Sequence, residues 1–180
     1  MSPYYEWDAK KDKFVRCPKP PKKNFKVRLR LANNRDKKLL LDFERECVRT
    51  EPEVFIDELK YYQERLRLIP KVNFSQKKNF KVVIALINQK IVGQLVMSWY
   101  FCYETNSKVG VITGLWVLKP YRMAGIGRKL IAFAKKEFKK WGVKRITLVV
   151  GISNLAAKEF YKKCGFKIRR IDEAIHENGN

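Results

Sequence analysis

The hydrophobic pattern of the sequence changes its period at Pro120. Before this residue, three stretches have the short apolar pattern of strands, namely Phe80 to Ile87, Ile91 to Phe101 and Val109 to Val117. After it, the apolar side chains from Arg128 to Trp141 recur at helical spacing, opposite a row of lysines. A chain that alternates these two periods is expected to fold as a mixed α/β protein.

Shorter segments extend this pattern on both sides. It predicts strands at Lys26 to Leu31, Arg145 to Val150 and Phe166 to Ile171, and helices from Asn33 to about Arg49, at 54–68 and from Asn154 to Cys164. The element order is β-α-α-β-β-β-α-β-α-β, and 180 residues suit one core, so we expect one domain over residues 26–180. Residues 1–25 are rich in proline and lysine and predict a basic arm outside that domain.

The charge of the chain is strongly positive and unevenly distributed. The formal net charge is +22, from 40 Lys and Arg against 18 Asp and Glu. Residues 122–170 carry 15 basic and 2 acidic residues, whereas residues 41–70 carry 5 basic and 8 acidic residues. Such a surplus attracts polyanions such as nucleic acid, nucleotide phosphates or anionic lipid, and an acidic or nucleic-acid partner is the expectation here. A lysine-rich solvated surface without a partner remains the alternative for most of these lysines.

The cysteines and the apolar runs narrow the class of protein further. Cys17, Cys47, Cys102 and Cys164 form no C-x-x-C pair, and His176 is the only histidine, so neither a metal site nor a disulfide framework is expected. No apolar run reaches the roughly 20 residues of a membrane-spanning helix. These features predict a cytoplasmic protein without a membrane partner. They leave the oligomeric state open, a dimer included.

The segment from Val117 to Leu130 joins a predicted strand to a predicted helix through a glycine-containing loop. Gly125 and Gly127 let the backbone approach a ligand closely, and the first N–H groups of the helix face outward. Arg122 and Arg128 place positive charge beside them. The pattern predicts a phosphate cradle, with a simple tight turn as the alternative. It matches neither the P-loop nor the dinucleotide fingerprint.

A second motif begins at Asn154 and ends at Phe166. Tyr161 lies seven residues after Asn154, two turns along the same helical face, so both side chains can line one cleft. Each also has a simpler interpretation. Asn154 is a good helix N-cap, and Tyr161 is suited to a core position beside Phe160.

Together the two motifs resemble the GNAT superfamily of N-acetyltransferases. They read Arg122-x-x-Gly125-x-Gly127 and Asn154-x-x-Ala157-x-x-x-Tyr161-x-x-x-Gly165-Phe166, and the order of elements over residues 26–171 is similar too. The resemblance implies a mostly antiparallel sheet with a central, splayed parallel strand pair, flanked by helices. It also implies acetyl-coenzyme A as co-substrate, held between the two splayed strands.

The resemblance assigns roles to particular residues. The backbone of three residues would bind the pantetheine arm and the acetyl carbonyl: Leu115, Trp116 and Val117. The diphosphate would lie against Arg122, Met123, Ala124, Gly125, Ile126, Gly127 and Arg128. Asn154 would touch the pantetheine, and Tyr161 would be the catalytic general acid that protonates the departing thiolate.

The chain departs from the family pattern in two places. Family members often carry a carboxylate base on a splayed strand, but Thr113 and Val149 stand at the matching positions here. A water relay, a carboxylate of residues 41–70 or Glu104 would then take the amine proton, or the protein binds coenzyme A without efficient catalysis. The carboxyl end is also short, and the arm with Phe14-Val15 is expected to fill the edge of the sheet.

The sequence therefore predicts an acetyl-coenzyme A-dependent N-acetyltransferase for a primary amine on a small molecule or a protein. The acidic segment 41–70 is expected to border the acceptor. An alternative from another class is a nucleic-acid- or ribosome-associated binding module on the same fold, favoured by the missing carboxylates and the basic surface. A protein acetyltransferase with an acidic target is a third hypothesis.

Overall fold

The computed structural model describes residues 5–8, 13–16, 25–52, 59–75, 78–151 and 154–169. Its contacts divide the chain into two compact units. The larger unit runs from Pro20 to Val149, and the smaller unit combines Met1–Lys19 with Val150–Asn180.

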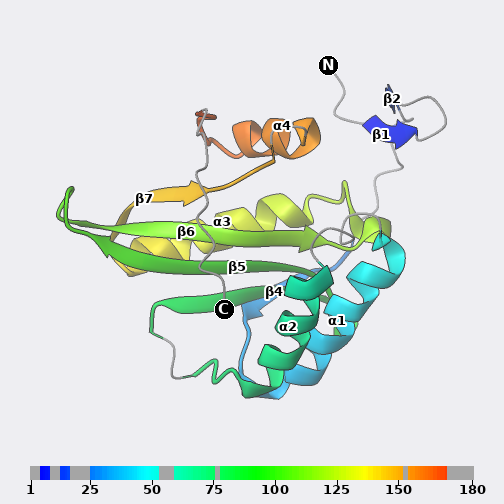
Figure 1. The fold of residues 1–180 in the computed structure, drawn as a ribbon, viewed down its shortest axis with the longest axis horizontal. Helices are drawn as coiled ribbons and strands as arrows, with labels where there is room; N and C mark the ends of the chain where they lie inside the picture. Colours follow the sequence, from blue (N-terminus) through cyan, green and yellow to red (C-terminus); the bar gives the residue numbers. More distant parts are fainter. Residues whose placement is uncertain are drawn as a thin grey trace. The chain divides into compact units, whose positions relative to one another are not determined.

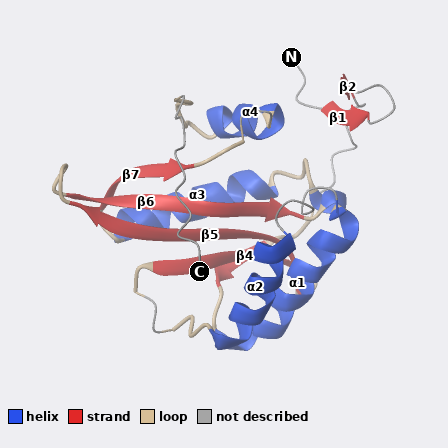
Figure 2. Cartoon of the chain, in the orientation of Figure 1, coloured by secondary structure: helices blue, strands red, loops and turns tan. Residues whose placement is uncertain are grey.

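The larger unit is built on a five-stranded sheet in the order β3-β4-β5-β6-β7 (Figures 1 and 2). The strands are β3 (Arg28–Leu31), β4 (Phe80–Ile87), β5 (Lys90–Cys102), β6 (Ser107–Val117) and β7 (Val143–Leu148). The first three neighbouring pairs are antiparallel, and β6 pairs with β7 in parallel. The predicted fold class, a mostly antiparallel α/β sheet with one parallel pair, is confirmed.

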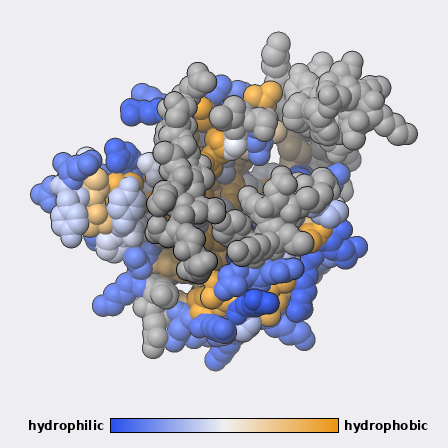
Figure 3. Space-filling model, in the orientation of Figure 1, coloured by the Kyte–Doolittle hydropathy of each residue, from blue (hydrophilic) through white to orange (hydrophobic). Residues whose placement is uncertain are grey.

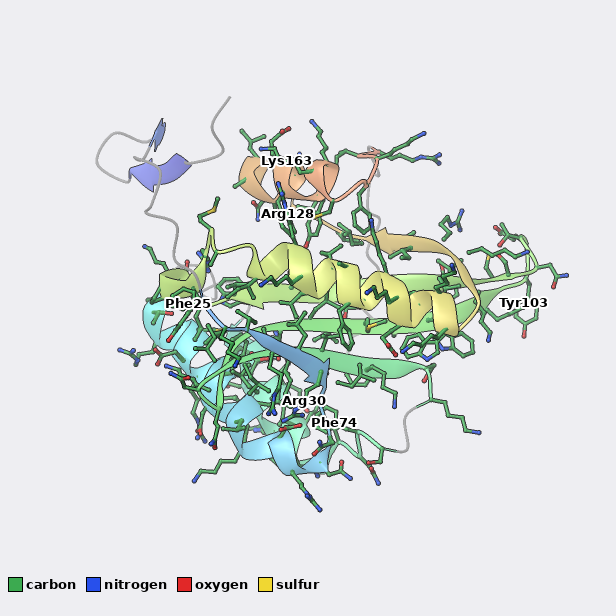
Figure 4. All side chains as sticks on the ribbon, turned by 180° about the vertical axis from the view of Figure 1, so that it is seen from behind. Phe25, Arg30, Phe74, Tyr103, Arg128 and Lys163 are labelled. Atoms are coloured by element: carbon green, nitrogen blue, oxygen red, sulfur yellow. The ribbon has the colours of Figure 1, made fainter. Side chains whose placement is uncertain are left out.

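Helices cover both faces of this sheet. Helix α3 (Ile126–Lys140) packs on one face, behind the sheet in Figure 1 and in front of it in Figure 4. A Cβ atom at Gly110 would lie 2.6 Å from Phe138 of α3, so glycine permits this close contact. Helices α1 (Lys37–Thr50) and α2 (Leu59–Leu68) contribute to a hydrophobic core on the other face. The coverage explains why β5 is buried almost continuously from Ile91 to Met97.

Local sequence signals set two of the element boundaries. Asn33 accepts a hydrogen bond from the Arg35 N–H, and Asp36 bonds back to the Asn33 N–H, which completes a capping box. This 3-10 turn leads directly into α1, as the predicted Asn cap requires. Asn88 and Gln89 both have positive φ, so the predicted hairpin between β4 and β5 closes with a two-residue turn.

Other boundaries differ from the sequence prediction. Helix α3 begins at Ile126, so Gly127 lies in its first turn and not in the preceding loop. Strand β7 lies two residues earlier than expected. The last predicted strand, Phe166 to Ile171, is wrong over 166–169, which form no strand, and 170–171 lie outside the described residues. The first residues of the predicted helix 54–68 also lie outside them.

The smaller unit contains a hairpin and one helix. Strands β1 (Tyr5–Asp8) and β2 (Lys13–Arg16) pair with each other in a sheet of their own. The expectation that Phe14-Val15 completes the main sheet is wrong, because β2 belongs to this two-stranded sheet and not to the five-stranded one. Helix α4 (Leu155–Lys163) follows Asn154. In the described part of the chain, no helix is long and apolar enough to span a membrane, and no cluster of three metal-ligating side chains occurs.

Candidate active site

Strand β6 continues past the end of its parallel neighbour. It pairs with β5 as far as Val117, but with β7 only as far as Ile112, which lies beside Leu148. Among the described residues, Thr113 to Val117 therefore have no strand partner on their second edge. This is the splayed pair that the family resemblance implies. An open edge of this kind can bind the amide groups of an extended ligand as an added strand would.

The hydrogen-bond alternation of β6 decides which residues face the open edge. The Leu118 N–H bonds the Val92 carbonyl of β5 at 2.9 Å. In an antiparallel pair the backbone groups alternate, so Trp116 also points toward β5, whereas Leu115 and Val117 point to the open side. The predicted backbone contacts to a pantetheine arm thus fit Leu115 and Val117. The backbone N–H and C=O groups of Trp116 are directed toward β5 and do not face the open edge.

A β-bulge marks the point where the two strands separate. Met97 pairs with Ile112 and Val96 with Gly114, so Thr113 has no partner in β5. The bulge reverses the alternation: Ile112 is buried on the α3 side, and Gly114 lies against Val96 on the α1 side. Thr113 itself is exposed. No sequence pattern indicated this bulge.

The loop between β6 and α3 is built from tight turns and left-handed residues. Tyr121 and Arg122 donate their N–H groups to Leu118 and Lys119. Met123 and Gly125 then adopt positive φ angles of 64° and 76°. The first helical bond runs from Lys129 to the Gly125 carbonyl, so the N–H groups of residues 126–128 have no carbonyl acceptor within the helix. Such groups, at the positive end of a helix, can bind a diphosphate.

The side chain of Arg122 is held against the protein surface, with 37% of it exposed. Its guanidinium bonds both carboxylate oxygens of Glu51, at the end of α1, and donates from Nε to the Val117 carbonyl at 2.8 Å. It also lies over the ring of Trp116, 5.2 Å from the centroid. The prediction gave Arg122 a free charge beside the phosphates, but Glu51 neutralises that charge. The exposed Arg128 remains as the cation of the motif.

The Glu51–Arg122 pair joins segments 71 residues apart, so its removal should destabilise the protein. We expect Glu51→Gln to lower the free energy of unfolding by about 1–2 kcal/mol, because the partly exposed guanidinium loses a charged acceptor that water replaces only in part. Glu64→Gln is the matched control: its pair with Arg67 is exposed and 3.9 Å long, and is worth roughly 0–1 kcal/mol. Urea unfolding of both variants measures the difference. Equal losses would contradict a structural role for Glu51.

The acidic segment 41–70 does not present free carboxylates where the structure describes it. Each described carboxylate has a cationic partner: Asp42 with Arg45, Glu44 with Arg65, Glu46 with Arg49, Glu51 with Arg122 and Glu64 with Arg67. Glu53, Asp57 and Glu58 lie outside the described residues. The expected attraction of a cationic acceptor to this segment is therefore weakened.

Two of the carboxylates proposed as bases differ in their positions. Glu44 is buried and accepts hydrogen bonds from Arg65 and Gln94, so it holds α1, α2 and β5 together. Glu104 lies in the turn before β6, and the seven residues from Ser107 to Thr113 alone span about 20 Å. Glu104 is therefore too far from the open edge to receive a proton directly.

The second motif lies in the smaller unit. Asn154 caps α4, with its side-chain oxygen accepting from the Ala157 N–H at 3.0 Å, as predicted. Tyr161 is 9% exposed and contacts the rings of Phe160 and Phe166, with centroids 5.2 and 5.8 Å away. Burial, with a smaller contribution from Cys164, raises the pKa of its phenol. Tyr161 therefore keeps its proton at neutral pH.

A splayed strand pair, a glycine-containing loop and a helix starting at that loop define an α/β domain whose open edge and helix N-terminus suit an extended, diphosphate-bearing ligand. The family model described as "Acetyltransferase (GNAT) family" matches residues 40–166, more than two thirds of the chain. The chain belongs to the GNAT family.

Curated relatives share part of this sequence. The chain is 32% identical over 84 residues to an aminoalkylphosphonate N-acetyltransferase of Salmonella typhimurium, covering 47% of this chain and 54% of the relative. It is 29% identical over 103 residues to an N-alpha-acetyltransferase of Sulfurisphaera tokodaii, covering 53% and 62%. The matches thus span less than two thirds of these relatives.

Solved structures confirm the fold over a larger share of the chain. An integron cassette protein from the mobile metagenome of V. cholerae superposes with a TM-score of 0.70 at 21% identity, covering 87% of this chain and 95% of that one. An aminoglycoside N-acetyltransferase in complex with CoA gives 0.67 at 15% identity, covering 87% and 98%. At these identities the likeness concerns the fold.

Proposed function

We propose that the protein is an acetyl-coenzyme A-dependent N-acetyltransferase that acts on a primary amine. The observation that carries this proposal is the open edge of β6 beyond Ile112, followed directly by the loop and the first turn of α3. The backbone of Leu115 and the N–H group of Val117 suit the amides of a pantetheine arm, while the Val117 carbonyl is taken by Arg122. The N–H groups of residues 126–128 suit a diphosphate. Family membership supports the same assignment.

The chemistry divides between the acetyl carbonyl and the leaving sulfur. Acetyl-coenzyme A supplies the activated acetyl group as a thioester. The amine nitrogen forms a bond to the carbonyl carbon, and the carbon–sulfur bond breaks. A backbone N–H at the open edge would stabilise the negative charge on the carbonyl oxygen. Tyr161 would donate its proton to the departing thiolate, for which a phenol kept neutral by burial is suited.

The proton lost by the amine has no carboxylate acceptor at the two family positions. Thr113 is exposed at the bulge, and Val149 follows β7 with 84% of its surface exposed. We propose that water takes this proton to solvent. The amine would then have to be unprotonated when it binds, so turnover should rise with pH toward the pKa of the acceptor.

Acetyl-coenzyme A should stabilise the folded protein. A ligand at 100 times its Kd adds about 2.7 kcal/mol to the free energy of unfolding, which raises the Tm of a chain this size by roughly 5–10 °C. ATP at the same concentration is the control, because it carries phosphates but no pantetheine arm. Thermal unfolding with each ligand measures the shift. An equal shift with ATP would indicate nonspecific attraction to a basic protein.

A panel of amines that differ in net charge can identify the acceptor. The relatives and structural neighbours carry names that point to an aminoalkylphosphonate, protein amino termini and aminoglycosides, which are very different amines. The assay measures coenzyme A release with four candidate acceptors: an aminoalkylphosphonate, an acidic peptide, spermidine and an aminoglycoside. If the donor binds but no amine causes coenzyme A release, the alternative function, a nucleic-acid- or ribosome-associated binding module, is favoured.

A further inference from the structure

The far end of the β5–β6 hairpin carries a group of exposed aromatic side chains. Tyr100, Phe101 and Tyr103 have 51%, 41% and 87% of their surfaces exposed, three of eight large hydrophobic side chains exposed in the described residues. Phe101 and Tyr103 stand edge to face, 5.2 Å apart. Tyr103 projects from the hairpin tip in Figure 4, and pale and orange surface gathers at this end in Figure 3. We call these three residues the hairpin aromatics.

The fold does not require these rings. Strand β4 begins beside Ser98, so β5 extends beyond it toward the tip. The base of this extension is fixed by Lys108, which lies over the Trp99 ring at 4.5 Å and donates to the Trp141 carbonyl at 2.9 Å. The hairpin aromatics lie outside that arrangement. Grouped exposed apolar surface of this kind is typical of an interaction site.

The surroundings of the hairpin aromatics are basic. In the strand register, Lys108 is opposite Phe101 and beside Val143, next to two further cations of β7. Lys144 and Arg145 follow Val143 in β7, and Lys139 and Lys140 end α3 just before Trp141, whose carbonyl Lys108 contacts. Lys78 precedes Asn79, whose carbonyl accepts from the Trp99 N–H. The carboxylates near it in the described chain are Glu104 and Glu137, and Glu137 is paired with Lys140. The charge therefore suits a polyanion.

We propose that the hairpin aromatics and the surrounding cations bind single-stranded nucleic acid. Unpaired bases stack on exposed aromatic rings, and lysines contact the phosphates between them. A duplex keeps its bases stacked on each other and cannot use the rings. Tyr100 and Phe101 project from opposite faces of β5, which suits bases entering from either side. An anionic membrane surface would instead favour apolar side chains gathered on one face.

The test is fluorescence anisotropy with a labelled 20-residue oligothymidylate and the full chain. The variant Tyr100→Ala/Phe101→Ala/Tyr103→Ala should bind at least 10-fold more weakly at fixed salt. Leu68→Ala, an exposed apolar truncation on α2, is the matched control and should bind as the parent does. Lys139→Gln/Lys144→Gln should reduce the slope of log affinity against log salt by about 1.4, if both lysines contact phosphates.

Several results would overturn the proposal. One is unchanged affinity in the aromatic variant, because attraction by charge alone would then suffice. Others are equal binding of a duplex of the same length, or binding to phosphatidylserine vesicles without oligonucleotide binding. A dimer in sedimentation that the aromatic variant loses would show that a second copy covers the patch. Thermal unfolding of each variant without ligand shows that it is folded, whether or not the protein binds acetyl-coenzyme A.

Discussion

Tyr161→Phe should lower kcat by about 10²–10⁴-fold while leaving the affinity for acetyl-coenzyme A nearly unchanged. The substitution keeps the ring that packs between Phe160 and Phe166, and removes only the hydroxyl proton. If that proton reaches the leaving thiolate, its loss removes general acid catalysis, which is usually worth this factor. Steady-state coenzyme A release and donor titration on the same preparation separate the two quantities.

The control for this experiment is the same chemical change at an exposed tyrosine. Tyr103→Phe deletes one hydroxyl on the hairpin tip, where 87% of the side chain is exposed, and should leave turnover unchanged. If Tyr161 serves only the packing of α4, Tyr161→Phe should alter stability by about 1 kcal/mol and leave turnover intact. That outcome would remove Tyr161 from the mechanism.

The parts of the fold that were predicted correctly are those set by local sequence. The Asn33 cap, the hairpin turn at Asn88 and the Asn154 cap each depend on residues within a few positions, and all three occur. The change of hydrophobic period at Pro120 separates the strands from α3 for the same reason. Local spacing and turn chemistry carry this information directly.

The parts that were missed depend on residues far apart in the chain. Glu51 and Arg122 meet across 71 residues, and no local pattern could show that a motif arginine is neutralised there. The bulge at Thr113 depends on the register of β5 against β6. The segment that begins at Phe166 has the apolar pattern of a strand but forms none where it is described, and the Phe166 ring packs on Tyr161. Tertiary contacts override propensity in each case.

In the candidate site too, the features set by local sequence were predicted and those set by distant contacts were missed. The motif correctly placed a glycine-containing loop before α3, and the structure adds that Gly125 there has a left-handed φ. It could not show that Leu115 and Val117, and not Trp116, face the open edge, since that alternation is fixed by the pairing with β5. The sequence thus located the segment proposed to bind the donor, and the pairing of β6 with β5 determines which of its backbone groups face the open edge.

Gly125→Val should abolish the melting shift caused by acetyl-coenzyme A. Gly125 has φ +76°, and a Cβ at this position would meet no atom within 4 Å. The substitution therefore clashes with nothing in the protein, but it strains the backbone and places a branched side chain where the diphosphate is expected. Thermal unfolding with and without ligand measures the loss.

Gly142→Val is a closely matched control for that result. Gly142 has φ +72° and equally open space around its missing Cβ, but it follows the opposite end of α3. Both substitutions should cost about 1–2 kcal/mol in stability, because both force a side chain into the left-handed region. Gly142→Val should nevertheless keep the full ligand-induced shift, since no donor contact is proposed there. Loss of the shift in both variants would mean that general strain in α3 is responsible, and a retained shift in Gly125→Val would move the diphosphate away from this loop.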